Sequence, residues 1–226
     1  MNNDLKRMEQ FYSSRENNAW SLFKCYPFFL ASKQLYVLTK ILDEKKLHRQ
    51  KILDIGAGSG SFILNLILLG ASAENISAVE YLEDRFIQLK TRLPNIHALN
   101  QNYLDVNFQF KFDLITIMAV LTSITDNTSR YQIVSKALEE LEENGMLIIY
   151  DFFDEKETFL SKNYRAISMK KIKELANNYK IVEYKKVYLH SKIAKGLCKL
   201  NLQEFIPILE KLKLFNANYH FVIISK

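Results

Sequence analysis

The sequence predicts an α/β fold in which a doubly wound, mostly parallel sheet carries helices on both faces. Three observations favour this class. Short apolar runs alternate with helical stretches between residues 50 and 153. The first apolar run continues into a glycine-rich turn and a helix, in KILDIGAGSGSF. The closing NYHFVIISK reads as a strand without a compact crossover helix directly before it, so we expect this last strand to run antiparallel.

Composition limits the classes of protein to which the chain can belong. Its 226 residues suit one globular domain, and 48% hydrophobic with 12% aromatic residues excludes a disordered chain. No apolar run approaches the roughly 20 residues that span a bilayer, and the opening MNNDLKRMEQ does not resemble a secretory signal. Cys25 and Cys198 match no metal or redox spacing. We therefore expect a cytoplasmic protein with reduced, structural thiols.

The net charge of +6 raises the question of a polyanionic partner. Many of the lysines lie in helical stretches after Lys170, where glutamates are interleaved with them. No dense basic block marks a nucleic-acid-binding tail. A solvated basic surface is the favoured interpretation, and an anionic substrate or partner is the alternative.

The first 49 residues are expected to form helices that pack against the sheet. They hold an aromatic cluster, which we interpret as packing rather than ligand binding: Trp20, Phe23, Tyr26, Phe28 and Phe29.

The central part of the chain alternates between the two kinds of element. Strands are predicted at 51–56, 75–80, 96–99, 112–120 and 145–153. Helices are predicted at 61–70, 84–93 and 129–142. Asn144 and Gly145 should form the turn into the strand that starts at 145.

The last part departs from this regular alternation. Residues 181–189 alternate like a strand, and a long helical stretch at 191–214 is interrupted by Gly196 and Pro207. Residues 218–226 form the final predicted strand.

Half of the six glycines stand within five residues, at Gly56, Gly58 and Gly60. A strand followed by such a turn and a helix brings backbone close to a ligand at the carboxyl end of a parallel sheet. Glycine suits this place because a Cβ would block the ligand and because some turn positions need a positive φ. The spacing is G-x-G-x-G, and Ser61 stands where the dinucleotide fingerprint has its third glycine.

Acidic residues beside the turn narrow the choice of ligand. Asp54, two positions before the first glycine, would repel a pyrophosphate but can serve a cation. Glu80 ends the second predicted strand, and its two oxygens suit the two hydroxyls of a ribose, while Tyr81 offers a ring to adenine. An adenosine with a positive group and no phosphate fits this set. S-adenosylmethionine is the obvious candidate.

At this point the chain resembles the class I S-adenosylmethionine-dependent methyltransferases, from about Trp20 to Lys226. The matching stretches are LDIGAGSG (53–60), AVEYLEDR (78–85), FDLITIMAVLTSITD (112–126) and NGMLIIYDF (144–152). The resemblance implies a seven-stranded, Rossmann-like methyltransferase fold in one domain. Its parts would be an N-terminal helical cap (1–49), a cofactor-binding core (50–153), and substrate-side and closing elements (154–226), with a helical insertion before the last strand.

The resemblance also assigns residues to the cofactor. Gly56, Ala57 and Gly58 would face its methionine part, with Asp54 near the amino end, and Glu80 would bind ribose beside Tyr81. The remaining positions in the family's pattern fall on residues expected near adenine, Asn102 and Tyr103, and near the sulfonium, Met118 and Ala119.

The sequence gives fewer signals for the residues that would contact the methyl acceptor than for those that would bind the cofactor. A hydroxyl acceptor needs a proton acceptor, and Asp151 and His190, each at a predicted strand end, are the candidates. Tyr164 and Arg165 could hold an anionic substrate. No residue is assigned to a metal.

The class of methyl acceptor is inferred from motifs that the sequence lacks. The position after the fourth strand reads MAVLTS rather than the D/N-P-P-Y/F motif of amino-methylating nucleic-acid enzymes, and neither cysteine ends a strand near the cofactor. These absences, with a resemblance to small bacterial tailoring methyltransferases, favour O-methylation of a sugar, glycan precursor or related small metabolite. An RNA methyltransferase and a non-catalytic binding protein remain the alternatives, and nothing indicates the oligomeric state.

Overall fold

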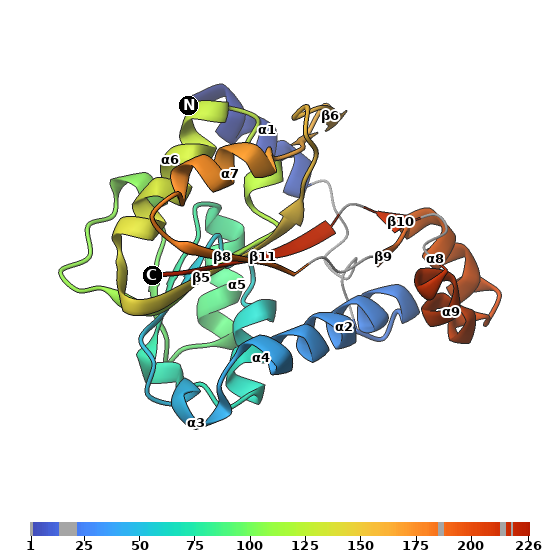
Figure 1. Ribbon diagram of the computed structural model, residues 1–226, viewed down its shortest axis with the longest axis horizontal. Helices are drawn as coiled ribbons and strands as arrows, with labels where there is room; N and C mark the ends of the chain where they lie inside the picture. The colour runs from blue at the N-terminus through green and yellow to red at the C-terminus, as the bar shows by residue number, and fades with distance from the viewer. Residues whose placement is uncertain (1, 14–21, 185–187, 213–215, 218) are drawn as a thin grey trace.

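A seven-stranded sheet forms the centre of the structure (Figure 1), a computed structural model that describes residues 2–13, 22–184, 188–212, 216–217 and 219–226. Its strand order is β3-β2-β1-β4-β5-β11-β8. These strands are β1 (Ile52–Ile55), β2 (Ile76–Val79), β3 (His97–Leu99), β4 (Phe112–Met118), β5 (Leu141–Phe152), β8 (Lys180–Tyr184) and β11 (Tyr219–Ser225). β1 to β5 run parallel to one another, and β11 runs antiparallel to both β5 and β8. The predicted fold class and the direction of the last strand are confirmed.

Helices cover both faces of this sheet. They are α1 (Asn2–Ser13), α2 (Cys25–Ile41), α3 (Glu44–Leu47), α4 (Ser61–Leu68), α5 (Glu83–Arg92), α6 (Asn127–Glu139), α7 (Met169–Leu175), α8 (Ser191–Lys199) and α9 (Ile206–Lys211). Figure 1 shows α6 and α7 on one face and α2 and α4 on the other. Each face has its own buried apolar cluster, with α6 and α7 packed in one and α2, α4 and α5 in the other.

The apolar strand residues explain why both faces are covered. Along β1, Leu53 and Ile55 lie in the cluster beneath α6, whereas Ile52 lies in the cluster beneath α2. β4 alternates in the same way, since Ile115 and Leu114 belong to opposite clusters. Strands that are apolar on both sides can be buried only between two layers of helices.

One strand begins earlier than predicted, and the structure contains elements that the sequence did not predict. β5 begins at Leu141 rather than at Gly145, and Asn144, with φ +67°, lies inside the strand rather than in a turn before it. A hairpin of β6 (Phe159–Ser161) and β7 (Tyr164–Arg165) follows, and then α7. The stretch expected as one interrupted helix is α8, a 3-10 turn (Gln203–Phe205) and α9. Gly196 lies within α8, so it does not break that helix.

The C-terminal helices belong to a helical unit, which we define as residues 188–212 and which lies to one side of the sheet in Figure 1. Its first strand, β9 (Tyr188–Leu189), pairs with β10 (Asn216–Ala217), which follows the unit in the chain. The unit contacts α2 through a disulfide between Cys25 and Cys198 and through an ion pair between Lys33 and Glu210. The expectation of reduced thiols is therefore wrong.

The N-terminal aromatic cluster also needs correction. Phe23 and Phe28 are exposed, while Tyr26 and Phe29 are half-buried against the helical unit rather than against the sheet. Trp20 lies outside the described residues. Searching the helices that the structure describes finds none that is both long and apolar enough to cross a membrane.

Candidate functional site

The glycine-rich loop connects β1 to α4 at the carboxyl edge of the sheet. All three of its glycines have positive φ, +70° at Gly56, +57° at Gly58 and +84° at Gly60. A Cβ on Gly60 would lie 2.8 Å from side-chain atoms of Leu89 and Leu93. The last glycine is therefore required for packing against α5, whereas a Cβ on Gly58 would meet only the guanidinium of Arg85, at 3.2 Å. The backbone at Gly58 is thus the part of the loop that a ligand can approach.

Glu80 joins this loop to the end of β2. Its carboxylate accepts hydrogen bonds from the Gly58 N–H at 2.7 Å and from the Leu82 N–H at 2.8 Å. The side chain is buried, and burial raises the pKa of this carboxyl group. Each carboxylate oxygen can accept a second hydrogen bond, so the group can still receive two hydroxyls.

Asp54 lies deeper, within β1. Its Oδ1 atom accepts a hydrogen bond from the Thr116 hydroxyl of β4 at 2.7 Å, and the residue is buried. Burial raises the pKa of Asp54 to about 7. A cation close to this carboxyl group would favour its charged form.

The loop after β4 faces the glycine-rich loop. Ala119 has φ +57°, which is uncommon for a residue other than glycine, and its N–H donates to the Tyr150 carbonyl at 2.7 Å. Val120 follows, and its Cγ2 atom would lie 2.5 Å from a Cβ at Gly56. Backbone held in this region of φ is frequent at ligand sites. Met118 and Ala119 therefore stand at the same edge as Gly56, as the parallel register of β1 and β4 requires.

Asp151, a predicted catalytic residue, makes hydrogen bonds within the protein. It lies near the carboxyl end of β5, but its side chain is 0% exposed. The carboxylate accepts hydrogen bonds from the hydroxyl of Thr122 and from the Thr122 N–H, the latter at 3.2 Å. Burial raises its pKa to about 6. Asp151 therefore holds the loop after β4 in place.

The side chains of Asn102 and Tyr103 have different surroundings in the structure. The Oδ1 atom of Asn102 accepts from the Leu104 N–H at 3.2 Å, so the residue caps a 3-10 turn (Tyr103–Asp105). The Tyr103 ring is buried in the cluster beneath α6, and its hydroxyl donates to Glu140 at 2.6 Å. Tyr103 is thus a core residue.

Helix α1 lies close to this edge, which sequence analysis did not anticipate. The Arg7 guanidinium donates to the Ser123 carbonyl at 2.5 Å and to the Asn163 carbonyl at 3.1 Å. The Tyr12 ring stacks on Arg85, whose Cζ atom lies 3.9 Å from the ring centre. Arg85 appears in the second matched stretch of the sequence, but nothing local indicates that Tyr12 reaches it.

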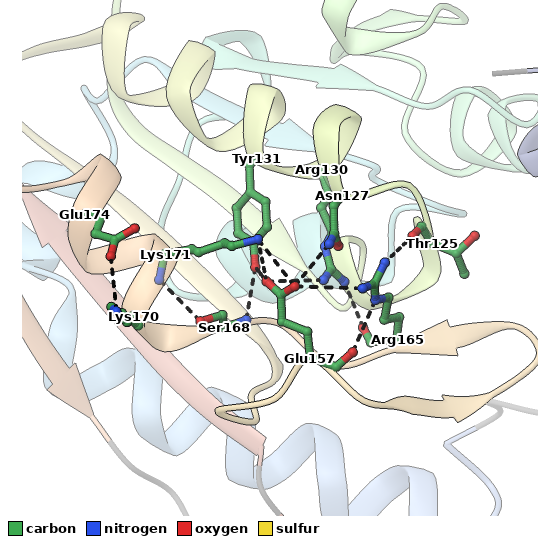
Figure 2. A network of polar contacts seen from close by, with 10 residues as sticks. All are labelled: Thr125, Asn127, Arg130, Tyr131, Glu157, Arg165, Ser168, Lys170, Lys171 and Glu174. Atoms are coloured by element: carbon green, nitrogen blue, oxygen red, sulfur yellow. Dashed lines mark hydrogen bonds and ion pairs between the residues drawn. The ribbon is translucent and has the colours of Figure 1, made fainter.

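Arg165 is held within the protein, as Figure 2 shows. Its guanidinium donates to the carbonyls of Glu157 at 3.2 Å and Thr125 at 3.3 Å. The Glu157 carboxylate also pairs with Arg130 of α6 at 3.7 Å and with Lys171 of α7 at 3.3 Å, and it accepts from the Tyr131 hydroxyl. Glu157 thus joins the hairpin region to two helices.

The other predicted acceptor-side residues, Tyr164 and His190, make contacts with other parts of the protein. Tyr164 packs edge-on against Phe11 of α1, with ring centres 5.4 Å apart. His190 is exposed, and its Nδ1 atom accepts from the Lys192 N–H at 3.3 Å, so it caps α8. Across the residues that the structure describes, no group of three or more His, Cys, Asp or Glu side chains could hold a metal ion. A surface hollow beside Lys51, Ser77 and His97 lies at the opposite, amino edge of the sheet.

Solved structures with the same fold are numerous, although no family model and no curated protein matches the chain. The N-methyltransferase NodS from Bradyrhizobium japonicum WM9 in complex with S-adenosyl-L-homocysteine superposes with TM-score 0.65 and 12% identity, covering 93% of each chain. Magnesium protoporphyrin IX methyltransferase from Synechocystis PCC 6803 with bound S-adenosylmethionine superposes with TM-score 0.61 and 11% identity. The match covers 98% of this chain and 90% of that one.

A third structure, a S-adenosylmethionine-dependent methyltransferase from Archaeoglobus fulgidus, gives a TM-score of 0.61 at 13% identity. It covers 87% of this chain and 94% of its own. These likenesses show the fold: the chain has the Rossmann-like sheet of S-adenosylmethionine-dependent methyltransferases.

The stability of the protein should depend on the protonation of Asp54. Its pKa in the folded chain, about 7, lies above the ordinary 3.8, so the folded state binds this proton more tightly. The resulting stabilisation is present below the ordinary pKa and is lost as the pH rises through 7. Between about pH 5 and pH 8, the free energy of unfolding should fall on the order of 2 kcal/mol further in the wild type than in Asp54→Asn. Urea titrations of both proteins at several pH values measure this difference. If the free energy of unfolding changes equally with pH in the two proteins, the raised pKa of Asp54 is contradicted.

Replacing Glu157 should destabilise the protein, because Arg130 is 0% exposed and would lose its carboxylate. We expect Glu157→Gln to lower the free energy of unfolding by about 2 kcal/mol or more. Glu174→Gln is the matched control: its pair with Lys170 is exposed and 3.9 Å long, so its effect should stay within about 0.5 kcal/mol. Indistinguishable urea midpoints for the two variants would show that Arg130 does not depend on Glu157.

Proposed function

We propose that this chain is a S-adenosylmethionine-dependent methyltransferase. The observation that carries the proposal is the carboxylate of Glu80 at the end of β2, 2.7 Å from the Gly58 N–H of the loop that follows β1. The neighbours of the same fold support it, because they hold S-adenosylmethionine or S-adenosylhomocysteine. An open backbone at Gly58 and a buried acid beside it suit an adenosine that carries a cation and no phosphate.

Different residues along the carboxyl edge would bind different parts of the cofactor. Glu80 would accept from the two ribose hydroxyls, and Tyr81 and Asn102 would lie beside adenine. Gly56, Ala57 and Gly58 would face the methionine part. Asp54, with its raised pKa, would be stabilised in its charged form by the cofactor's amino group. When bound, the cofactor supplies an electrophilic methyl group on a sulfonium.

The protein's own contribution would be alignment. Met118 and Ala119 would stand beside the sulfonium, and Asp151 would fix their loop through Thr122. Holding two reactants in line is worth up to roughly 7–11 kcal/mol in favourable cases. We therefore assign Asp151 to positioning rather than to proton transfer. Tyr164 and Arg165 would border the acceptor through the hairpin, as parts of the wall rather than as free anion ligands.

For the acceptor we propose a hydroxyl of a sugar, a glycan precursor or a related small metabolite, which places the chain in glycan biosynthesis. The basis is the absence of nucleic-acid methyltransferase motifs and the resemblance to tailoring enzymes. The similar folds do not decide the acceptor atom, since one of them is an N-methyltransferase. A cytoplasmic location is part of the same proposal. RNA methylation and cofactor-fold binding without catalysis are the alternatives.

Removing Glu80 should weaken cofactor binding. Glu80→Ala should cost about 1.5–3 kcal/mol in the affinity for S-adenosylhomocysteine, the range for hydrogen bonds to a charged group. Glu83→Ala is the control, because Glu83 is an exposed acid three residues away at the start of α5. Titration calorimetry measures both. Tighter binding of NAD than of S-adenosylhomocysteine by the wild type would overturn the cofactor assignment.

The acceptor class is tested by transfer of a radiolabelled methyl group to sugars, glycan precursors and RNA in parallel. We expect label in a hydroxyl-bearing small acceptor and none in RNA. An RNA enzyme would bind RNA with a steep loss of affinity as salt rises, since several phosphate contacts release counterions. Salt-sensitive RNA binding together with labelled RNA would contradict the proposed acceptor.

A further inference from the structure

The helical unit (residues 188–212) exposes large apolar side chains that nothing in the structure covers within the described residues. Five of them lie between residues 200 and 212, each between 41% and 69% exposed: Leu200, Leu202, Phe205, Ile208 and Leu212. Phe28, on the part of α2 to which the unit is joined, is exposed as well. Scattered exposed apolar residues are normal, but a group of this size in so short a segment indicates a surface that meets another phase or molecule.

The spacing in α9 separates a buried side from an apolar exposed side. Ile206 and Glu210 are buried, with Ile206 in the core of the unit and Glu210 paired with Lys33. Phe205, Ile208 and Leu212 follow the i, i+3, i+7 spacing, so they form one stripe along the turn and the helix. The stripe faces away from the buried side and is not part of the unit's own core.

Helix α8 adds a basic stripe. Lys192, Lys195 and Lys199 also follow the i, i+3, i+7 spacing and are exposed, opposite the buried Ala194. Residues 188–212 hold four lysines and two glutamates, and the buried ion pair with Lys33 takes up one of the glutamates. The unit therefore carries an excess of lysines as well as exposed apolar side chains.

The position of the unit relates it to the candidate site. β11 pairs antiparallel with β5, with Tyr219 opposite Phe152, so β11 begins beside the carboxyl end of β5. β9 and β10 continue outward from there, and Figure 1 shows α8 and α9 past that end of the sheet. The apolar and basic surface thus lies off the same edge of the sheet as the glycine-rich loop.

We propose that the helical unit docks on the surface of an anionic lipid bilayer. Phe, Ile and Leu side chains on one stripe, with lysines on a neighbouring helix, are the combination with which interfacial helices bind such membranes. The charge argues against a second copy of this chain as the occupant, because a symmetric contact would bring the lysines of both copies together. Anionic headgroups neutralise the same lysines.

This docking deepens the proposed function and, as to the acceptor, rests on it. A bilayer beneath the helical unit would lie near the carboxyl edge, where the methyl group would be presented. The acceptor class that suits this arrangement is a glycan precursor or other hydroxyl compound carried on a membrane lipid. Lipid binding itself needs no catalysis, so the two ideas can fail separately.

Vesicle flotation of the full-length, oxidised protein tests the docking. The probes are phosphatidylcholine vesicles and vesicles of equal parts phosphatidylcholine and phosphatidylglycerol. We expect binding to the second kind only. Phe205→Ser with Ile208→Ser should weaken it about tenfold or more, since two large apolar side chains no longer enter the interface. Lys192→Gln with Lys199→Gln should weaken it by a similar factor.

Two matched controls keep the result specific. Leu68→Ser removes an even more exposed apolar residue, from α4, and Lys170→Gln with Lys173→Gln removes two exposed lysines from α7. Both controls should bind as the wild type does. Sedimentation velocity shows whether Ile208→Ser changes the oligomeric state. The proposal is overturned by absent wild-type binding, by equal binding to neutral vesicles, by equal losses in the controls, or by a wild-type dimer that Ile208→Ser dissociates. Circular dichroism and the urea midpoint of each variant verify its fold without relying on cofactor binding.

Discussion

The carboxylate of Glu80 ties together the ends of β1 and β2, and the rest of the candidate site depends on this connection. It holds the Gly58 N–H from one side and the Leu82 N–H from the other. The Val79 carbonyl adds bonds from the N–H groups of Gly56 and Ala57, at 2.8 and 3.1 Å. The loop therefore keeps the positive φ angles that leave its backbone open, and α4 starts from Gly60 in a fixed direction.

Buried acids recur along the same edge of the sheet. Asp54 near the end of β1, Glu80 after β2 and Asp151 near the end of β5 are all buried, and burial raises the pKa of each. Burying a carboxylate opposes folding unless hydrogen bonds or a cation compensate. Hydrogen bonds compensate at Glu80 and Asp151. At Asp54 a single hydroxyl does so, which leaves that residue the most responsive to a cationic ligand.

The sheet and the glycine-rich loop could be predicted because their causes are local. Apolar runs and glycine spacing appear directly in the sequence, as in Ile52–Ile55 and Gly56–Gly60. Contacts between distant segments could not be predicted in this way. Cys25 and Cys198 are 173 residues apart, and no spacing rule pairs them. Asp151 was expected to face an acceptor, but alternation along a strand does not reveal that Thr122 returns over it. Arg165 was predicted to hold an anionic substrate, and the sequence does not indicate that the fold places Glu157 beside it.

The central claim is that S-adenosylmethionine lies against Glu80 at the carboxyl edge, and a crystal structure with S-adenosylhomocysteine tests it most directly. The account predicts both ribose hydroxyls within hydrogen-bonding distance of the Glu80 carboxylate, with the methionine part along Gly56 to Gly58. Density for the ligand at any other place, or a ribose that does not contact Glu80, would contradict it.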